Sequence, residues 1–405
     1  MSLFRSLAHR PFALLWAGQT ISRVGDFLYE IALAWWVLEK TGSATAMAGV
    51  LIFAFTPMLL FLLIGGVAVD RYPRVKLMLA SDLLRGAVVA LVAALAFSQQ
   101  LEIWHVYIAS LIFGLVDAFF QPAYTALVPD ITPHEHLTSA NSLTSMSMQI
   151  GRIAGPALGA AAIGLGGTAG AFALDGASFF VSAACLMPLL NSSAPPAREA
   201  GSPPASVLRD MREGIDTVLG SPVLWISILV FALSNIMLAG PYGVAMPFLV
   251  KDYLKADAGT LGLLYAIFPI GYIIGGAWLG RLARIRRRGP TAYIGLMIAG
   301  LMLLTFGLPV PLVVLVLAAL INGAALEIES LIWTNILQET VPGERLGRVA
   351  SIDSLGSFAL LPVGYALAGW ATDRLGAAPV FVIGGGLTAI VAILALAHPA
   401  IRALD

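Results

Sequence analysis

The chain has 405 residues, of which 59% are hydrophobic and only 11% are charged, and its mean hydropathy is +0.89. A water-soluble domain is about one quarter charged, so this composition excludes a soluble globular protein and indicates one embedded in a membrane. The net charge of zero argues against a nucleic-acid partner, and the single cysteine, Cys185, excludes a disulfide framework.

Twelve apolar segments are each long enough to cross the hydrocarbon core of a bilayer, which takes about 20 residues of helix. Six of them precede the polar stretch at residues 191–222, and six follow it. In chain order the predicted spans are residues 12–38, 44–69, 77–98, 103–127, 141–165, 168–190, 223–250, 259–280, 291–310, 312–337, 348–372 and 376–398. The sequence therefore predicts an all-α membrane protein with twelve transmembrane helices.

Lysine and arginine are distributed unevenly over the loops between these spans. With the N-terminus inside, sixteen of the 23 basic residues lie in cytoplasmic segments, three lie within spans, and four lie on the opposite side. Cytoplasmic loops of membrane proteins carry such an excess of basic residues. We therefore expect both termini to be cytoplasmic.

An internal repeat of about 209 residues divides the chain. Residues 128–137 align with residues 337–346 through a proline, a glutamate and a leucine at matching places. A chain whose halves repeat in this way indicates a duplicated protein, an organisation common among membrane transporters. We expect two pseudo-symmetric six-helix bundles, residues 1–190 and 223–405. The linker 191–222 is expected to form a cytoplasmic amphipathic helix that serves as a tether or as a regulatory element.

Two acidic side chains, Asp26 and Glu30, lie within the first predicted span. Residues four apart share one helix face, and a charge at bilayer depth costs at least about 2.5–3.5 kcal/mol unless it faces a cavity, finds a partner or is protonated. We interpret both as proton-coupling residues, with Asp26 carrying the proton and Glu30 assisting it or contacting a cationic substrate. Two alternatives stay open: Arg23 neutralises Asp26, or the motif serves helix packing around Gly25.

Candidate substrate-binding residues come from the tenth span and from aromatic and polar positions elsewhere. Glu327 and Glu329 lie about 200° apart on a helix, so both cannot face the same cavity. Glu329 shares its face with a polar and aromatic stripe that suits a cavity wall, whereas Glu327 shares its face with a glycine that suits a helix contact. The predicted substrate-binding residues are Glu329, Glu327, Asn235, Tyr29, Trp333 and Phe120.

Several motifs are similar to those of one transporter family. The loop after the second span reads Gly66-Val67-Ala68-Val69-Asp70-Arg71-Tyr72-Pro73-Arg74, and the fifth span reads Gly151-Arg152-Ile153-Ala154-Gly155-Pro156-Ala157-Leu158-Gly159. They resemble the loop signature and the glycine–proline antiporter motif of the major facilitator superfamily, and the resemblance covers nearly the whole chain. The pattern Ser22-x-x-Gly25-Asp26 further resembles the drug:proton antiporter branch that contains macrolide, tetracycline and enterobactin-type siderophore exporters.

The resemblance implies roles for the motif residues. Asp70, Arg71 and Arg74 would form a gating network near the cytoplasmic helix ends, with Asp70 latching the outward-facing state. The small residues Gly151, Gly155, Pro156 and Gly159 would permit close helix packing and a bend.

Arg152, within the antiporter motif, needs an acid or a water-filled cavity, and its candidate partners are Asp117, Asp26 and Glu30. The fourth span lacks the arginine that many proton-coupled drug antiporters carry there. The mechanism implied by that arginine is therefore not carried over.

The resemblance implies a secondary active transporter that exports lipophilic or amphipathic small molecules, such as antibiotics, by proton-coupled alternating access. A dedicated siderophore or natural-product exporter is the alternative within transport, and a non-transporting membrane sensor is the alternative from another class. No G-x-x-x-x-G-K-[ST] loop occurs, so ATP is not the direct energy source. We expect no enzymatic activity, no cofactor and no metal. We expect a monomer in a bacterial cytoplasmic (inner) membrane, whose partners are its substrate, protons and lipid.

Overall fold

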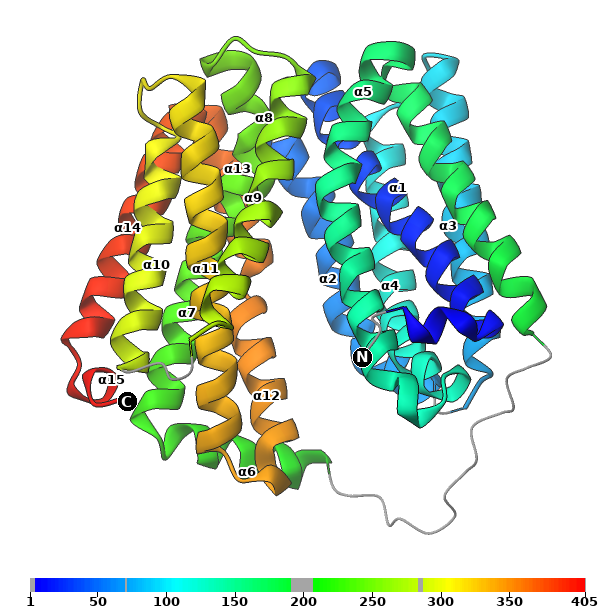
Figure 1. Cartoon of the computed structure of the whole chain (residues 1–405). Coiled ribbons are helices and arrows are strands. Elements are labelled where there is room, and N and C mark those ends of the chain that lie inside the picture. The colour runs from blue at the N-terminus through cyan, green and yellow to red at the C-terminus, as the bar shows by residue number, and fades with distance from the viewer. Residues whose placement is uncertain (1–3, 70, 191–206, 283–286, 405) are drawn as a thin grey trace. The chain divides into compact units, whose positions relative to one another are not determined.

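Regular structure in this protein is helical throughout the described residues, which in the computed structural model are 4–69, 71–190, 207–282 and 287–404 (Figure 1). Within a bilayer no water satisfies backbone N–H and C=O groups, and a helix satisfies them within the segment itself. The predicted all-α fold class is confirmed. All twelve predicted spans lie largely on these helices.

The first compact unit comprises Met1–Glu199 together with Ala256–Ala266. Its own helices, blue to green in Figure 1, are η1 (Arg5–Ala8), α1 (Arg10–Thr41), α2 (Ala44–Val69), α3 (Arg74–Phe97), α4 (Ile103–Ile131), η2 (His134–His136), α5 (Leu137–Leu186) and η3 (Met187–Leu189). The 50-residue α5 covers two predicted spans, and its helical backbone is interrupted at Gly167, where φ is +67°. Glycine adopts this conformation without the steric cost that a side chain would bring.

The second compact unit comprises Ala200–Lys255 together with Ile267–Asp405. Its own helices are α6 (Val207–Leu219), α7 (Pro222–Gly240), η4 (Pro241–Ala245), α8 (Met246–Phe248), η5 (Leu249–Tyr253), α10 (Arg288–Thr305), α11 (Leu312–Thr340), α12 (Gly343–Phe358), α13 (Leu361–Leu375), α14 (Ala377–Ala397) and α15 (Pro399–Arg402). Helix α9 (Ala258–Leu279) contributes residues to both units.

Ten helical segments within the described residues are long and apolar enough to cross a membrane. One of them, His134–Leu189, has 56 residues and covers two predicted spans. Helix α1, 32 residues long, covers the first predicted span but is not among the ten. Its apolar sequence is interrupted by Arg23, Asp26 and Glu30, so the charges that lower its hydropathy are also its candidate functional groups.

The same close helix contact occurs in each unit. In the first unit α1 packs against α5, and a Cβ atom added to Gly155 would lie 2.4 Å from the Cβ of Phe27. In the second unit α7 packs against α13, and a Cβ atom added to Gly364 would lie 3.0 Å from the Cα of Ile236. Each residue is separated from its counterpart by 209 positions. Small residues that let two backbones approach are typical of helix contacts in membranes.

The glycines of a second close contact are also 209 positions apart, whereas the residues they meet are 214 apart. Gly114 of α4 meets α2 so closely that an added Cβ would lie 1.8 Å from the carbonyl oxygen of Ala54. Gly323 of α11 meets α9 in the same way, with 2.1 Å to the carbonyl oxygen of Phe268. The sequence repeat therefore corresponds to repeated helix packing within each unit.

Polar contacts fix two segments near the helix ends. Helix α6 packs against α12, where the Arg348 Nη1 donates to the Glu213 Oε2 over 2.6 Å. Before α9, the Asp257 carboxylate accepts the backbone N–H of Thr260 over 3.0 Å, and this hydrogen bond lowers the pKa of Asp257. Such caps satisfy one of the N–H groups that a helix leaves open at its start.

The α1–α5 contact makes a prediction for stability. Gly155→Ala places a methyl group against the rigid Cβ of Phe27, so it should destabilise the unit by about 1–3 kcal/mol, as overpacking does. Thermal unfolding of the purified protein should show an apparent Tm at least about 2 °C lower.

The matched control is Gly164→Ala on the same helix, where an added Cβ meets nothing within 4 Å. It should leave the apparent Tm unchanged or raise it slightly. Equal melting temperatures for the two variants would contradict a specific α1–α5 contact at Gly155.

Candidate functional site

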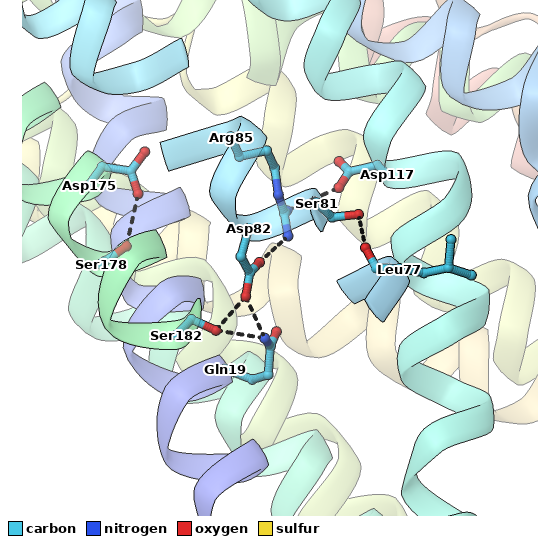
Figure 2. Close-up of polar contacts among 9 residues, drawn as sticks. All are labelled: Gln19, Leu77, Ser81, Asp82, Arg85, Asp117, Asp175, Ser178 and Ser182. Atoms are coloured by element: carbon cyan, nitrogen blue, oxygen red, sulfur yellow. Dashed lines mark hydrogen bonds and ion pairs between the residues drawn. The ribbon is translucent and has the colours of Figure 1, made fainter. Parts of the chain in front are cut away.

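A buried charge cluster in the first unit is centred on Arg85 of α3. Its Nη2 donates to Asp82 Oδ1 over 2.9 Å, and its Nη1 donates to Asp117 Oδ1 of α4 over 3.2 Å (Figure 2). The Arg85 side chain is 4% exposed and that of Asp82 is 0% exposed. The pairing of Asp82 with Arg85 is the one their spacing of three residues predicts, whereas Asp117 joins it from 32 positions away.

Neighbouring side chains complete this cluster. Ser182 donates its hydroxyl to Asp82 Oδ2 over 2.7 Å, and Gln19 Nε2 donates to the same oxygen over 3.4 Å (Figure 2). The guanidinium of Arg85 lies over the rings of Phe120 and Phe179, at 4.2 Å and 4.7 Å from their centroids. A buried ion pair is stable only when its remaining hydrogen-bonding groups are satisfied, and these contacts supply much of that requirement.

Asp26 of α1 faces a cavity beside this cluster. The cavity has a volume of about 260 Å³, and its charged lining residues are Arg23, Asp26, Arg85 and Asp117. No hydrogen bond or ion pair with another described residue reaches the Asp26 carboxylate. Arg23 instead donates its Nη1 to the Met148 sulfur over 3.4 Å, so the alternative of a fixed Arg23–Asp26 ion pair is not the arrangement found.

Gly25 allows α1 to approach the second half of α5. A Cβ atom at Gly25 would lie 2.2 Å from Ser178 Oγ and 2.5 Å from Asp175 Oδ1. Asp175 is fully buried, and Ser178 donates its hydroxyl to it over 3.3 Å (Figure 2). The glycine next to Asp26 therefore has a packing role, and this role coexists with the access of Asp26 to the cavity.

Glu30 and Arg152 lie apart from the Arg85 cluster. Glu30 is exposed and does not line the cavity, although it is one helical turn from Asp26. The guanidinium of Arg152 is close enough to attract the Glu30 carboxylate electrostatically. Of the three acids expected as partners of Arg152, Asp117 is instead paired with Arg85.

The small residues of the antiporter motif face α1. Cβ atoms at Gly151, Gly155 and Gly159 would each lie within 2.9 Å of an α1 atom. Pro156 is buried in the same stretch of α5. This motif therefore places the helix that carries Asp26 directly against α5.

A larger cavity, of about 430 Å³, lies within the second unit. Three of the predicted substrate-binding residues, Glu329, Trp333 and Asn235, line this cavity. Two others, Tyr29 and Phe120, line the cavity of the first unit instead. Asn235 is held in place because its Nδ2 donates to the backbone carbonyl of Ser357 over 3.0 Å.

Glu327 does not line this cavity. Its Oε1 lies 3.4 Å from the position that a Cβ atom on Gly276 of α9 would occupy, so the side chain is directed at a neighbouring helix. The two glutamates of α11 thus point to different surroundings, as their offset of about 200° on a helix requires.

Asp353 of α12 is a cavity residue that the sequence reasoning missed. It lines the second cavity and accepts the indole N–H of Trp333 at Oδ2 over 3.2 Å. A signal was present, since an acid inside the predicted span 348–372 is costly unless it faces a cavity or a partner. Its relation to Trp333 and Glu329, some 20 positions earlier, needed the fold.

The loop signature is only partly within the described residues. Asp70 lies outside them, Arg71 is exposed, and Arg74 forms an ion pair with Asp130 near the end of α4. In the second unit Arg288, the first residue of α10, pairs with Glu339 of α11 over 2.5 Å. Asp130 and Glu339 are 209 positions apart, so each unit has an arginine–carboxylate pair at this place.

The two cavities are built at equivalent positions of the repeat. Eight lining residues of the first cavity have a counterpart 209 positions later that lines the second. The pairs are Ser22 and Phe231, Asp26 and Asn235, Tyr29 and Leu238, Phe113 and Asn322, Asp117 and Leu326, Phe120 and Glu329, Gln121 and Ser330, and Met148 and Ser357. Duplication therefore produced two copies of one cavity whose side chains have diverged.

Duplicated helical units, each with acids at membrane depth and a cavity, are typical of membrane transporters. The sequence profile of the Major Facilitator Superfamily matches residues 15–364 and 233–401, and the chain belongs to this superfamily.

Similar proteins include exporters of several compounds. The macrolide efflux protein A of Streptococcus pyogenes is 28% identical over 97% of each chain. The multidrug efflux pump Tap of Mycolicibacterium fortuitum is 29% identical over 97% of this chain and 96% of its own. The enterobactin exporter EntS of Escherichia coli O1:K1 / APEC is 27% identical over 84% of this chain and 80% of its own.

Solved structures support the fold. A bacterial homologue of the iron transporter ferroportin in the inward-facing state superimposes with a TM-score of 0.73 at 17% identity, covering 96% of this chain and 99% of that one. At this identity the likeness concerns the fold alone. This chain is thus a superfamily transporter homologous to drug and siderophore exporters.

The ion pairs of Arg85 lead to a prediction about the stability of the protein. Arg85→Gln leaves Asp82 buried without its cation, and breaking such a pair costs about 3–5 kcal/mol. The purified variant should give a low yield and a clearly reduced apparent Tm.

Adding Asp82→Asn to Arg85→Gln removes the uncompensated charge, so the double variant should regain a large part of the lost stability. A single Arg85→Gln variant as stable as the parent protein would contradict the structural role of this cluster.

Proposed function

We propose that this protein is a secondary active exporter of lipophilic or amphipathic small molecules, driven by proton movement through alternating access. The observation that carries the proposal is the cavity beside the Arg85 cluster, in which Asp26 has no ion-pair or hydrogen-bond partner among the described residues. The exporters similar over nearly the whole chain support the direction of transport.

Asp26 is suited to a proton-carrying role because its neighbours are already engaged. Arg85 is shared between Asp82 and Asp117, so it is less available to neutralise a further carboxylate. A carboxylate that faces a cavity can gain or lose a proton without breaking an ion pair. Glu30, whose carboxylate is attracted electrostatically by Arg152, has an assisting role in this proposal.

Substrate contacts are assigned to the cavity of the second unit. Its volume of about 430 Å³ lies within the range of small-molecule sites, and its lining combines aromatic rings with a few polar groups, as such sites do. Glu329, Asn235 and Trp333 are its proposed contacts, whereas Tyr29 and Phe120 belong to the first cavity. Glu327 stays a candidate of lesser weight because it faces α9.

The remaining assignments complete this proposal. We place the protein in the bacterial cytoplasmic membrane as a monomer. Both termini are assigned to the cytoplasmic side, because sixteen of the 23 basic residues then lie there. The six-helix bundles are residues 1–190 and 223–405, and Asp70, Arg71 and Arg74 act in gating. Residues 191–222 connect the bundles.

A siderophore is the second candidate substrate, favoured by the similarity to the enterobactin exporter EntS. The two candidates are separated by a growth and export experiment in a host that lacks its own exporter. Enterobactin in the culture medium would support the siderophore candidate, and efflux of erythromycin or ethidium would support drug export.

Asp26→Asn should abolish proton-driven uptake of erythromycin or ethidium into inverted membrane vesicles. The amide cannot carry a proton, yet it has almost the same shape, so the protein should still fold. Uptake is measured after a pH gradient is imposed, and folding is checked by gel filtration of the purified variant.

The matched control is Glu102→Gln, which removes an acid paired with Lys40 over 2.7 Å at a half-exposed position. It should transport like the parent protein, because exposed ion pairs contribute little. Full gradient-driven uptake by Asp26→Asn would remove Asp26 from the coupling role.

Asp70→Asn should slow turnover without changing which compounds are exported, because a gating residue alters the conformational step and not the contacts to substrate. The measurement compares initial rates for several compounds in the same vesicles. A changed order of preference among the compounds would assign Asp70 to substrate recognition instead.

A further inference from the structure

Among the described residues, the wall of the second cavity contains acidic side chains and no basic ones. Glu329 and Asp353 line it, and no lysine or arginine is among the described residues of its wall. The two carboxylates are near enough to repel each other electrostatically. Within the described residues neither takes part in an ion pair. Two uncompensated acids at bilayer depth are costly, so a positively charged partner would be stabilised there.

Unlike the second cavity, the first cavity has basic side chains in its wall, Arg23 and Arg85. Its charged lining within the described residues consists of two arginines and two aspartates, so the formal charges of these four side chains balance. Arg23 corresponds to Ala232 at the repeat offset of 209. Arg85 corresponds to Ala299, since its neighbour Gly86 packs beside Phe179 as Gly300 packs beside Thr388. Both cations of the first cavity are therefore replaced by apolar residues in the second unit. The acids of the second cavity remain without the neutralisation that the first copy has built in.

A buried hydroxyl in the second cavity is also unsatisfied. Ser234 lines the cavity and is 2% exposed, and its Oγ has no hydrogen-bond partner among the described residues. Asp353 Oδ1 is also buried without a hydrogen-bond partner among the described residues, since the Trp333 indole N–H donates to Oδ2. Buried polar atoms are normally satisfied, so these two point to a ligand that completes the site.

Aromatic rings form much of the remaining wall. Phe231 and Trp333 meet edge to face with ring centroids 5.1 Å apart, and Tyr242, Phe268 and Tyr272 line the same cavity. Ring faces attract cations within about 6 Å of their centroids, and the attraction grows when water is excluded. The wall is therefore suited to an apolar molecule that carries positive charge.

We propose that the cavity of the second unit binds lipophilic organic cations, with Glu329 and Asp353 as the anionic contacts, and that it rejects anions of the same shape. The inference rests on the proposed export function and names the substrate class of its second cavity. It separates the two candidate classes of compound, because a cavity with two acids disfavours a carboxylate- or catecholate-rich siderophore.

The test uses two probes of matched shape and opposite charge, tetraphenylphosphonium and tetraphenylborate. The full chain is placed in lipid nanodiscs without any gradient, and binding of radiolabelled tetraphenylphosphonium is measured against empty nanodiscs. We expect saturable binding that tetraphenylborate displaces at least about tenfold more weakly than unlabelled tetraphenylphosphonium does. Glu329→Gln and Asp353→Asn should each weaken binding about tenfold, and Glu329→Asp, which keeps the charge, should retain more affinity than Glu329→Gln.

Glu339→Gln provides the matched control, because it removes an acid from the same helix ten residues away, about 15 Å along the axis. It should bind like the parent protein. Equal displacement by both probes, absence of tetraphenylphosphonium binding, or unchanged binding by both carboxylate variants would each overturn the inference. Because the assay needs no transport, cation binding without proton-driven export would reject the proposed function alone.

Discussion

The cost of an isolated charge in hydrocarbon is the constraint on which this structure depends. Every charged side chain at membrane depth must find a counter-charge, reach a cavity or lose its charge. The first unit meets this requirement by sharing Arg85 between Asp82 and Asp117, and by giving Asp26 access to a cavity. Within our proposal, Asp82 and Asp117 are acids held in ion pairs, whereas Asp26 is an acid that can gain or lose a proton. That distinction is what a proton-coupled transporter requires.

Duplication explains why two cavities have related walls and different chemistry. Helix contacts at Gly155 and Gly364 repeat at the same offset as the cavity positions, so the architecture stayed the same while the lining changed. Asp26 corresponds to Asn235, and Phe120 corresponds to Glu329. The first copy kept balanced charges beside a small cavity, and the second acquired acids and a larger volume. Within our proposal, one copy handles protons and the other handles substrate.

The sequence predicts most of the fold because hydropathy, glycine spacing and the repeat are local properties that the bilayer enforces. It also separates Glu329 from Glu327, since helical periodicity alone directs them to different faces. It does not predict that Asp117 joins Arg85, or that Asp353 meets Trp333, because those contacts join different helices. Asp26 and Glu30 were expected to share one helix face, but only Asp26 lines the cavity. Glu30, one helical turn further along α1, lies outside the cavity lining.

Infrared difference spectroscopy of the purified protein tests the central claim most directly, because it detects the carbonyl band of a protonated carboxyl group. Spectra are recorded as the pH is stepped, for the parent protein and for Asp26→Asn and Asp82→Asn. The account predicts a carboxyl band that appears and disappears with pH and that is lost only in Asp26→Asn. A pH-dependent band that survives in Asp26→Asn and is lost in Asp82→Asn would contradict it, because the titrating group would then be the one paired with Arg85.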